Sequence, residues 1–367
     1  MVSAFSGVEA ALNKISRYLS RAVLVGFALS LAALTAVFSL FAVIAELGDL
    51  GEAGYGFAQL TQYLLLTTPR RAFELLPSAA LVGSLVGLGG LAVGGELVAL
   101  RAAGFSILSI GRVLLLAALP ILVFALALGE LVVPPLERLG QEIRSHALGE
   151  LFSDGVGGGI WIRDSQAFIN VGIVNADQTL LQVSIYEFDE NQRMKAVTYA
   201  KKATKEQSGW ILHKLRQTLL VPEGAERVIA GRARWESTLA PENMAVGAVT
   251  PERMSVWELH EHAQFLAENG QSAGRYELAF WQKMFHPLTI MVMVLIALPF
   301  VFGSLRSGNL GQRVFIGIIF GMLFHIVSQA IGYLGLAYHL NLFVSALLPT
   351  LLFLGAGLVA ISIAQRT

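Results

Sequence analysis

Long apolar segments lie on both sides of one polar block. Asp, Glu, Lys and Arg are absent from residues 22–45, 75–95, 113–129, 284–305 and 314–365. A membrane-spanning helix needs about 20 apolar residues, because lipid offers the backbone no hydrogen-bond partners. The last segment has room for two helices, with a turn near 335–341. The pattern therefore predicts six spans, at about 22–45, 72–95, 109–133, 280–304, 312–335 and 340–364.

The polar block has the two-residue period of β-strands. Leu181, Val183 and Ile185 alternate with polar residues, as in a strand with one wet face. Turn residues separate runs of this kind, and a helical pattern at about 255–269 stops at Gly270. The strands are predicted at 159–163, 167–174, 181–188, 193–202, 209–215 and 216–222, after a flexible connection at 156–159. Such a series is typical of an antiparallel sandwich or jelly roll.

The predicted fold is an α-helical membrane protein with an inserted all-β domain. Six transmembrane helices, three plus three, flank a periplasmic β jelly roll. Residues 1–133 form the N-terminal membrane half and residues 277–367 the C-terminal half. Residues 134–276 form the β domain, with its closing helix at about 255–269.

Composition supports this division of the chain. The 367 residues are 55% hydrophobic and 14% charged, far more apolar than a soluble protein. Residues 137–283 hold 35 of the 52 charged side chains and all five tryptophans. The first span lacks a small-residue cleavage site and five more spans follow, which predicts a retained helix rather than a signal peptide.

The distribution of Lys and Arg predicts the orientation. The short outer loops carry only Arg70 and Arg71. The predicted inner face carries Lys14, Arg17, Arg21, Arg101, Arg112, Arg306, Arg313 and Arg366. Both termini are therefore expected in the cytoplasm, and the β domain outside.

Several classes of function are disfavoured. Without cysteine, the chain can form no disulfide, thiolate metal site or thiol nucleophile. A net charge of zero gives no overall attraction to nucleic acid. No phosphate-binding loop of the Gly-x-x-x-x-Gly-Lys-Ser/Thr type occurs, so energy for transport would come from a partner or an ion gradient. Glu74, Glu96 and Glu130 all lie at predicted span ends, which favours an external motor over ion coupling.

The histidines give little support for chemistry. His260 and His262 lie beside Glu258 and Glu261, a composition that suggests a metal site. Residues two apart on a helix point to different faces, so a solvated surface is the better interpretation. For His286 and His325, in or near the membrane, satisfied polar contacts are favoured over a proton relay.

Three pairs of glycines are spaced for close helix contact. They are Gly83/Gly87, Gly90/Gly94 and Gly317/Gly321. Small residues four apart let two helix backbones approach. The sequence does not choose between packing within the chain and a subunit interface.

The predicted inner loop at 94–112 is a candidate docking site. A short amphipathic helix at about 95–106 would contain Glu96, Leu97, Leu100, Arg101 and Gly104. Such a helix can lie in a groove of a cytosolic partner, with Glu96 paired to a basic residue there. The alternative is an ordinary loop whose Arg101 reaches lipid headgroups.

Three segments resemble a known family in the same order along the chain. They read LLPSAALVGSLVGLGGLAVGGELVALRAAGF at 75–105, GQSAGRYELAFWQKMFHPL at 270–288 and LRSGNLGQRVFIG at 305–317. With the three-plus-three spans around a β domain, they resemble the permease subunits of the bacterial lipopolysaccharide export transporter. The Gly-Gln-x-x-Gly-Arg-Tyr segment is more similar to the G subunit than to its F paralogue.

The resemblance implies a multi-pass, non-catalytic subunit of the bacterial inner membrane. Its partners would be the paralogous F permease, two copies of a cytosolic ATPase and a single-span periplasmic bridge protein, the C component. Lipopolysaccharide would pass from the outer leaflet through the β domain to that bridge. This chain would hold no cofactor, since the ATPase binds ATP and Mg²⁺, and no nucleic acid is implied.

The resemblance also assigns residues. The loop between the second and third spans is the family's coupling helix, and its acidic residue falls on Glu96. Arg144 matches a basic position at the outer rim, where it would meet lipid phosphates; Arg70 and Arg71 are candidates on position alone. Family members often carry lysines at the outer end of the first span, but no Lys or Arg lies between Arg21 and Arg70 here. The F subunit, a divalent cation or a differently charged lipid A would have to compensate for these missing lysines.

Other functions remain open from the sequence. One alternative is an export permease for another envelope lipid or a lipoprotein. Another is a membrane-anchored receptor or assembly scaffold whose β domain only binds partners. An intramembrane hydrolase is the weakest, since the spans contain no nucleophile–base–acid set.

Overall fold

The computed structural model describes two compact units. The described residues are 2–52, 54–148, 160–164, 167–174, 179–189, 193–206, 209–221, 224–235, 250–268, 272–302 and 310–366. One unit is helical and comprises Met1–Gly48, Leu64–Gly140 and Pro251–Thr367; the other comprises Asp49–Tyr63 and Gln141–Thr250. The predicted flexible connection at 156–159, the predicted helix stop at Gly270 and the inner-face residue Arg306 lie outside the described residues.

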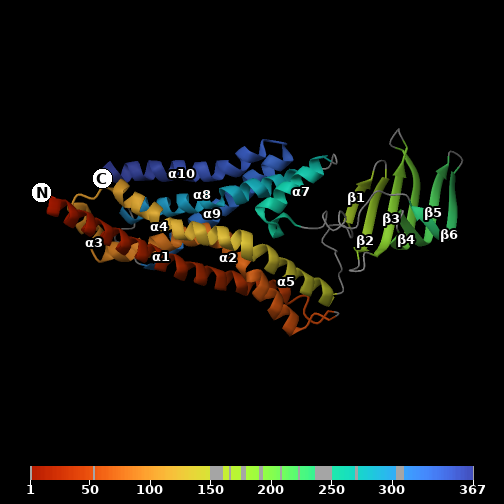
Figure 1. Ribbon diagram of the computed structural model, residues 1–367, viewed down its shortest axis with the longest axis horizontal. Helices are drawn as coiled ribbons and strands as arrows, with labels where there is room; N and C mark the ends of the chain where they lie inside the picture. Colours follow the sequence, from red (N-terminus) through yellow and green to blue (C-terminus); the bar gives the residue numbers. More distant parts are fainter. Residues whose placement is uncertain are drawn as a thin grey trace. The chain divides into compact units, whose positions relative to one another are not determined.

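Six helices in the described part are long and apolar enough to cross a membrane, as predicted. The elements that contain them are α1 (Val2–Glu46), α2 (Phe57–Val93), α4 (Ile107–Ala127) with η1 (Leu128–Val132) and α5 (Val133–Leu148), α8 (Gly274–Phe302), α9 (Leu310–Ala337) and α10 (Leu342–Arg366). The start of α1 and the end of α10 lie at the same end of the helical unit, as an even number of crossings requires (Figure 1). The prediction of a helical membrane protein with an inserted β domain is confirmed.

The helices extend beyond the apolar segments. α2 begins at Phe57, and the third span continues as helix to Leu148. Arg70 and Arg71 therefore lie within α2, and the prediction that they belong to an outer loop was wrong. The charge pattern marks where the hydrocarbon ends, whereas a helix continues wherever its backbone bonds and packing persist. Pro69 does not interrupt α2.

Glycines bring α1 and α2 into direct backbone contact. A Cβ added at Gly83 would lie 2.4 Å from the backbone N and Cα of Phe27, and one at Gly26 would lie 2.3 Å from the carbonyl oxygen of Gly83. On α9, Cβ atoms added at Gly317 and Gly321 would meet side chains of α2 at 2.9 Å and 2.7 Å. Two of the three glycine pairs therefore serve packing within this chain, because only a missing side chain permits such approach.

The β unit contains one six-stranded antiparallel sheet in sequential order, β1-β2-β3-β4-β5-β6 (Figure 1). The strands are β1 (Ile160–Asp164), β2 (Ala167–Val174), β3 (Leu180–Phe188), β4 (Met194–Glu206), β5 (Gly209–Val221) and β6 (Gly224–Trp235). The all-β prediction is confirmed. Among the described strands the order is that of a meander, without the crossovers that a jelly roll would add.

The fifth and sixth strands differ from the prediction. β5 is a single strand over 209–221, where two strands had been predicted, and β6 had been missed. Lys214 has a φ of +52°, so the two-residue alternation slips by one position within a continuous ladder. That slip resembles a strand end in the sequence, although the backbone pairing with β4 continues past it.

One face of the sheet is apolar. Alternate positions on β2 to β5 are buried: Ile169, Val171, Val183, Ile185, Ala200, Ala203, Trp210, Leu212 and Leu215. Ala230, Ala233 and Trp235 of β6 pack against this cluster. We call this side the apolar face and the other side the wet face.

Candidate functional site

The predicted docking helix is present as α3 (Glu96–Ala102), between α2 and α4. Gly95 and Gly104 lie on either side of it with φ of +75° and +95°. Left-handed backbone is readily adopted only by glycine, so these residues permit the sharp turns that separate a seven-residue helix from its neighbours. Ser106 then caps α4, accepting a 3.0 Å hydrogen bond from the backbone N–H of Ser109.

The predicted residues of α3 divide between two sides of the helix. Leu97 is 2% exposed, and Leu100 packs against the helical core. Glu96 and Arg101 are exposed, and the hydroxyl of Tyr18 on α1 donates a 3.3 Å hydrogen bond to Glu96. The leucines therefore hold α3 against its own chain, and the charged residues remain accessible to a partner.

A cavity of about 360 Å³ adjoins α3. Leu97, Val98 and Arg101 line it together with Val301 and Phe302 from the end of α8. Leu97 and Val301 also belong to one buried apolar cluster, so movement of α3 would reach α8 through packed side chains.

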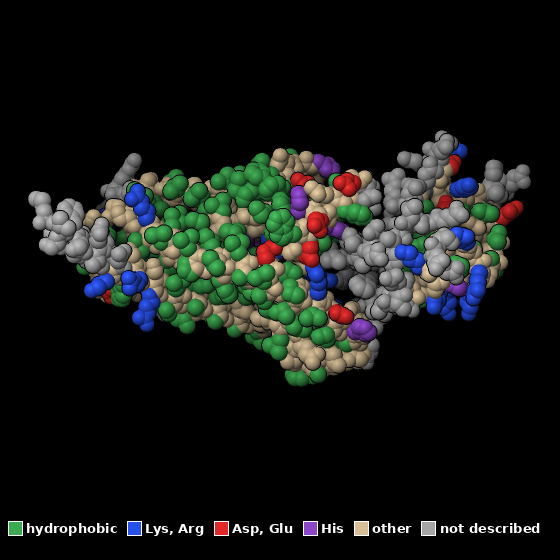
Figure 2. Space-filling model, in the orientation of Figure 1, with side chains coloured by type: hydrophobic (Ala, Val, Ile, Leu, Met, Phe, Trp, Pro, Cys, Tyr) green, Lys and Arg blue, Asp and Glu red, His purple; other side chains and the backbone are tan. Residues whose placement is uncertain are grey.

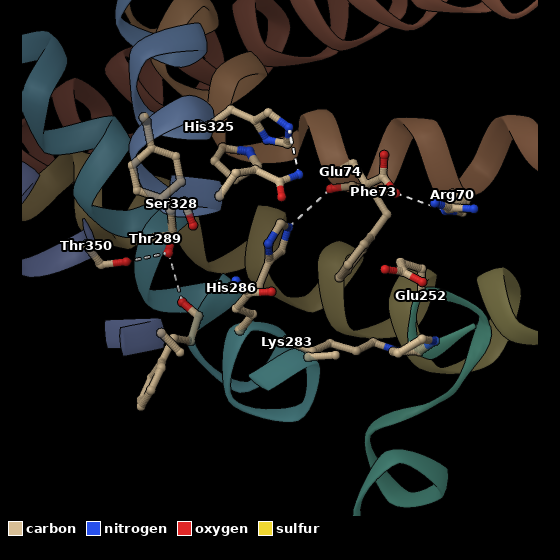
Figure 3. Close-up of a pocket in the computed structure, with 18 of the residues that line it drawn as sticks. Arg70, Phe73, Glu74, Glu252, Lys283, His286, Thr289, His325, Ser328 and Thr350 are labelled. Atoms are coloured by element: carbon tan, nitrogen blue, oxygen red, sulfur yellow. Dashed lines mark hydrogen bonds and ion pairs between the residues drawn. The ribbon is translucent and has the colours of Figure 1, made fainter. Parts of the chain in front are cut away.

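A second cavity, of about 390 Å³, lies among helices of the same unit (Figure 3). Its walls come from α2, α5, α7 (Val256–Glu268), α8, α9 and α10, with the short turn η2 (Pro251–Arg253). Arg70, Glu74, Lys283, His286 and His325 are among the lining side chains. Figure 2 shows hydrophobic side chains over most of the visible surface of the bundle, whereas several charged side chains and two histidines line this cavity.

Lys283 is the centre of a hydrogen-bonded network beside this cavity. Its Nζ lies 3.0 Å from Glu130 Oε1 and donates to the carbonyl oxygens of Gly129 at 2.9 Å and Met254 at 3.0 Å. The other oxygen of Glu130 accepts from the backbone N–H of Val256 at 3.0 Å. Glu130 lies in η1, a π-helical turn that widens the third span at this position. The network therefore joins the third span, α8 and the start of α7.

Neutral contacts satisfy the remaining polar groups deeper in the bundle. The His286 ring stacks on Phe73 at 4.3 Å, and its Nε2 lies 3.1 Å from the Phe73 carbonyl oxygen (Figure 3). Thr289 and Thr350 share a 2.9 Å hydrogen bond between α8 and α10. His325 is exposed and contacts Gln329 one turn later on α9 at 3.5 Å. The satisfied polar contacts predicted for both histidines are present.

The arginines predicted to bind lipid already have partners. Arg70 pairs with Glu74 at 2.9 Å and with the buried Glu137 at 3.3 Å. Arg71 donates to the carbonyl oxygen of Leu64 at 3.3 Å. A phosphate at either residue would have to compete with these internal acceptors.

Arg144 belongs to the other unit and pairs with Asp49 at 2.5 Å. Its guanidinium also lies 5.8 Å from the ring centroid of Tyr63, and the backbone N–H of Gly54 donates to Ala147 at 2.8 Å. These contacts hold the loop after α1 against the end of α5. Asp49 lies in the stretch between Arg21 and Arg70 that contains no Lys or Arg, and the sequence did not indicate that it pairs with Arg144.

Helix α7 is attached to the third span by its first turn. Ser255 and Glu258 form a reciprocal cap, with backbone N–H bonds of 2.8 Å and 3.3 Å, and Glu258 also pairs with Arg138 of α5. Partial burial would raise the pKa of Glu258, but the bonds from Arg138 and Ser255 outweigh it and hold that pKa below its usual value. The predicted domain boundary placed α7 with the β domain, whereas its contacts place it in the helical unit.

His262 is not on a solvated surface, so that interpretation was wrong for this residue. It is 5% exposed and packs edge-on against Tyr276 at 4.2 Å, and burial lowers its pKa. His260 on the other face is exposed, as predicted. The helix turns 100° per residue, so the two imidazoles lie on different sides: His262 is buried against Tyr276, whereas the exposed His260 has its ring 5.3 Å from that of Phe280 on the same helix α8. In the part of the chain that the structure describes, no three His, Cys, Asp or Glu residues lie close enough to hold a metal ion.

Comparison with known proteins identifies the family. The family model "Lipopolysaccharide export system permease LptF/LptG" matches residues 17–362. The chain belongs to the LptF/LptG family. The lipopolysaccharide export system permease protein LptG of Escherichia coli (strain K12) is 33% identical over 344 residues, which cover 92% of this chain and 95% of that protein. The LptG protein of Haemophilus influenzae is 31% identical over 347 residues, covering 94% and 96%.

The matches indicate an LptG-type permease, which confirms the resemblance seen in the sequence. An LptF/LptG-family protein with six membrane-spanning helices is a multi-pass protein of the inner membrane. Family membership also indicates a non-catalytic transport subunit within a lipopolysaccharide export system.

Proposed function

We propose that this chain is the G permease subunit of an ATP-driven transporter that exports lipopolysaccharide. It would pair with the paralogous F permease, and two copies of a cytosolic ATPase would drive the pair. Lipopolysaccharide would leave the outer leaflet of the inner membrane, enter between the permeases and pass through the β domain to the periplasmic bridge. Both termini would lie in the cytoplasm. The observation that carries the proposal is the match to LptG proteins over almost the whole chain.

The apolar surface of the helical unit supports a lipid substrate. Each buried CH₂ group is worth about 0.8 kcal/mol, so extracting several acyl chains requires an equally apolar receiver. α1 exposes large apolar side chains, including Val25, Leu29, Phe38 and Phe41. An apolar cavity of about 630 Å³ lies beside Phe27, Leu31 and Phe124.

The geometry of α3 supports an external motor. Its exposed Glu96 and Arg101 offer opposite charges to a cytosolic surface, and the buried Leu97 ties the helix to the bundle. A push on α3 would be transmitted to α8 through the apolar cluster that contains Leu97 and Val301. We therefore assign the contact with the ATPase to Glu96, Arg101 and the exposed Val98, with Leu97, Leu100 and Gly104 positioning them.

The β domain is suited to carry the acyl chains onward. Its apolar face is continuous from Ile169 on β2 to Leu215 on β5. Its buried side chains are 0–4% exposed, so acyl chains would regain there the hydrophobic contacts that they had in the membrane only when this face opens. The C component would receive the lipid next.

Co-purification from native membranes tests the proposal. The full chain is isolated in mild detergent, its protein partners are identified by mass spectrometry, and its bound lipid is analysed. We expect a second LptF/LptG-type permease, an ATPase and lipopolysaccharide. A different envelope lipid would contradict the substrate, and the absence of any ATPase would contradict the mechanism.

A further inference from the structure

Positive charge is concentrated in the last three strands of the sheet. β4, β5 and β6 contain nine Lys and Arg residues against two Glu, although the whole chain has 26 of each sign. β2 has no charged residue, and β3 has only Glu187. A charge distribution this one-sided creates a local field that the zero net charge conceals.

The ladder register places five of these residues on the wet face. Tyr199, Arg216 and Ile229 lie opposite one another, and so do Lys202, His213 and Arg232. The next residues along each strand, such as Ala200 and Leu215 or Ala203 and Leu212, belong to the buried apolar face. Because side chains alternate along a strand, the rows that begin at Tyr199 and Lys202 point away from the apolar face. The basic residues of the wet face are Lys202, Arg216, Arg227, Arg232 and Arg234.

These cations are exposed and close together. All five are exposed to solvent, and Figure 2 shows Lys and Arg side chains gathered over the β strands. No ion pair between described residues involves Lys202, Arg216, Arg227 or Arg232. Lys202 and Arg232 are two strands apart, about 10 Å between backbones. The wet face therefore offers several cations at spacings that suit a multiply charged anion.

Exposed aromatic rings lie on the same face of the sheet as the cations. Tyr199 is 39% exposed and is directly opposite Arg216 on the neighbouring strand. Phe168 is 40% exposed and is opposite Tyr186, in the row that ends at Arg227 on β6. Exposed rings can pack against the apolar faces of sugars, and arginines form paired hydrogen bonds with phosphates.

We propose that the wet face of β4–β6 binds the phosphorylated sugar head of the glycolipid. Lys202, Arg216 and Arg232 bind the phosphates, and Tyr199 packs against a sugar. This inference rests on the proposed function and extends it. It supplies cations for the head group in a chain whose Arg70 and Arg144 are occupied by Glu74 and Asp49.

The ring and cation combination favours a glycolipid head over a phospholipid surface. A bilayer of anionic phospholipid responds to the number of charges and offers no sugar for Tyr199. Selectivity therefore separates the two: a glycolipid site requires both the ring and the phosphates, whereas a membrane surface requires charge alone.

Site-specific crosslinking tests the proposal. A photoreactive phenylalanine analogue replaces Ile211, which lies opposite Arg234 on the wet face. The full complex that contains this variant is reconstituted with purified lipopolysaccharide. We expect labelling of lipopolysaccharide, reduced about tenfold by Arg216→Glu with Arg232→Glu and about threefold by Tyr199→Ala. Enzymatically dephosphorylated lipopolysaccharide should label about as weakly as the double variant. Vesicles of phosphatidylglycerol at equal charge should not compete.

Lys205→Glu is the matched control. Lys205 is exposed on β4 but lies opposite Trp210, on the apolar side of the ladder. The same charge reversal there should leave labelling within about twofold of that in the complex without the reversal. Circular dichroism of each purified variant reports whether it keeps its sheet, and tryptophan fluorescence, to which the buried Trp210 contributes, gives a second check.

Each alternative outcome overturns the inference. Unchanged labelling in the double variant excludes a binding site on the wet face. A loss of labelling in Lys205→Glu as large as in the double variant excludes it as well. Competition by phosphatidylglycerol assigns the face to a membrane surface instead. If lipopolysaccharide co-purifies with the complex but never labels this face, only this inference fails; if no lipopolysaccharide co-purifies, the proposed function fails.

Discussion

The ammonium group of Lys283 lies 3.0 Å from Glu130 Oε1, so one side chain of α8 closes the π-helical turn of the third span. The same ammonium group donates to the Met254 carbonyl, and Glu130 accepts from the Val256 amide. The pair therefore connects two membrane helices to the segment that returns from the β domain. In this position it can transmit movement of α8 to α7.

Removal of one charge from this pair should destabilise the protein. Lys283 is 13% exposed and Glu130 26%, so Lys283→Ala leaves a largely buried carboxylate without its cation. We expect a loss of about 2 kcal/mol or more in the free energy of unfolding, measured by denaturant titration in mild detergent. Glu130→Gln with Lys283→Met removes both charges and should cost less than Lys283→Ala. A larger loss in the double variant would contradict the pairing.

Glu96 should act in coupling and not in folding. Its side chain is exposed, so Glu96→Lys should leave thermal stability unchanged while ATPase association falls about tenfold or more. Co-purification and ATP-dependent lipid release measure the effect. Tyr18→Phe removes only the hydroxyl that bonds Glu96 and should retain association. Leu97→Ala should instead destabilise the chain by about 2 kcal/mol or more, because Leu97 is buried. Normal association and export in Glu96→Lys would exclude this residue from coupling.

Two glycines of α2 should respond in opposite ways to the same substitution. Gly83→Ala places a methyl group 2.4 Å from the backbone of Phe27, which must then move. We expect a loss of about 1–3 kcal/mol in stability. Gly90→Ala meets nothing within 4 Å and should gain up to about 1 kcal/mol from helix propensity. Thermal unfolding of the two variants in parallel measures the contrast, and equal effects would show that α1 and α2 do not depend on this contact.

His262 should make stability sensitive to mild acid. Burial lowers its pKa below 6.5, so the unfolded chain binds a proton that the folded chain excludes. Its contribution is complete above pH 6.5 and declines as the pH falls below that value toward the folded pKa. Unfolding midpoints at pH 7.5 and 5.5 measure the decline, which His262→Phe should reduce. His260→Gln changes an exposed residue of the same helix and should not alter it. An unchanged pH dependence in His262→Phe would contradict the assignment.

Asp49 should restrain any lipid contact of Arg144. The two side chains pair at 2.5 Å, so a phosphate must displace a carboxylate to reach the guanidinium. If Arg144 binds lipopolysaccharide, Asp49→Asn should raise crosslinking near this position about threefold, and Arg144→Glu should lower it. Asp49→Asn keeps the size of the side chain, so any change in crosslinking reports the loss of the charge. Unchanged crosslinking in both variants would assign the pair to loop structure alone.

The six helices could be predicted because lipid imposes a length of apolar sequence on each span. Their ends could not, since Arg70 and Arg71 continue α2 where the charge pattern suggested a loop. The β strands were visible wherever alternation was regular, and the prediction split β5 at Lys214, where the backbone takes a φ of +52°. The missed strand β6 is the exposed edge of the sheet, with few buried positions to mark it.

The candidate sites divide in the same way. The amphipathic pattern of Glu96, Leu97, Leu100 and Arg101 predicted α3, whereas the left-handed turns at Gly95 and Gly104 became visible only in the structure. Arg70 has one local partner, Glu74. Glu137, Asp49 and Glu130, which pair with Arg70, Arg144 and Lys283, are 67, 95 and 153 residues away along the chain, and no local pattern links them. Sequence alone determined the membrane segments, the inserted β domain and the family, because hydropathy and motifs are local properties. Only the tertiary structure decided which charges neutralise one another and which remain exposed, because ion pairing depends on distances that folding creates.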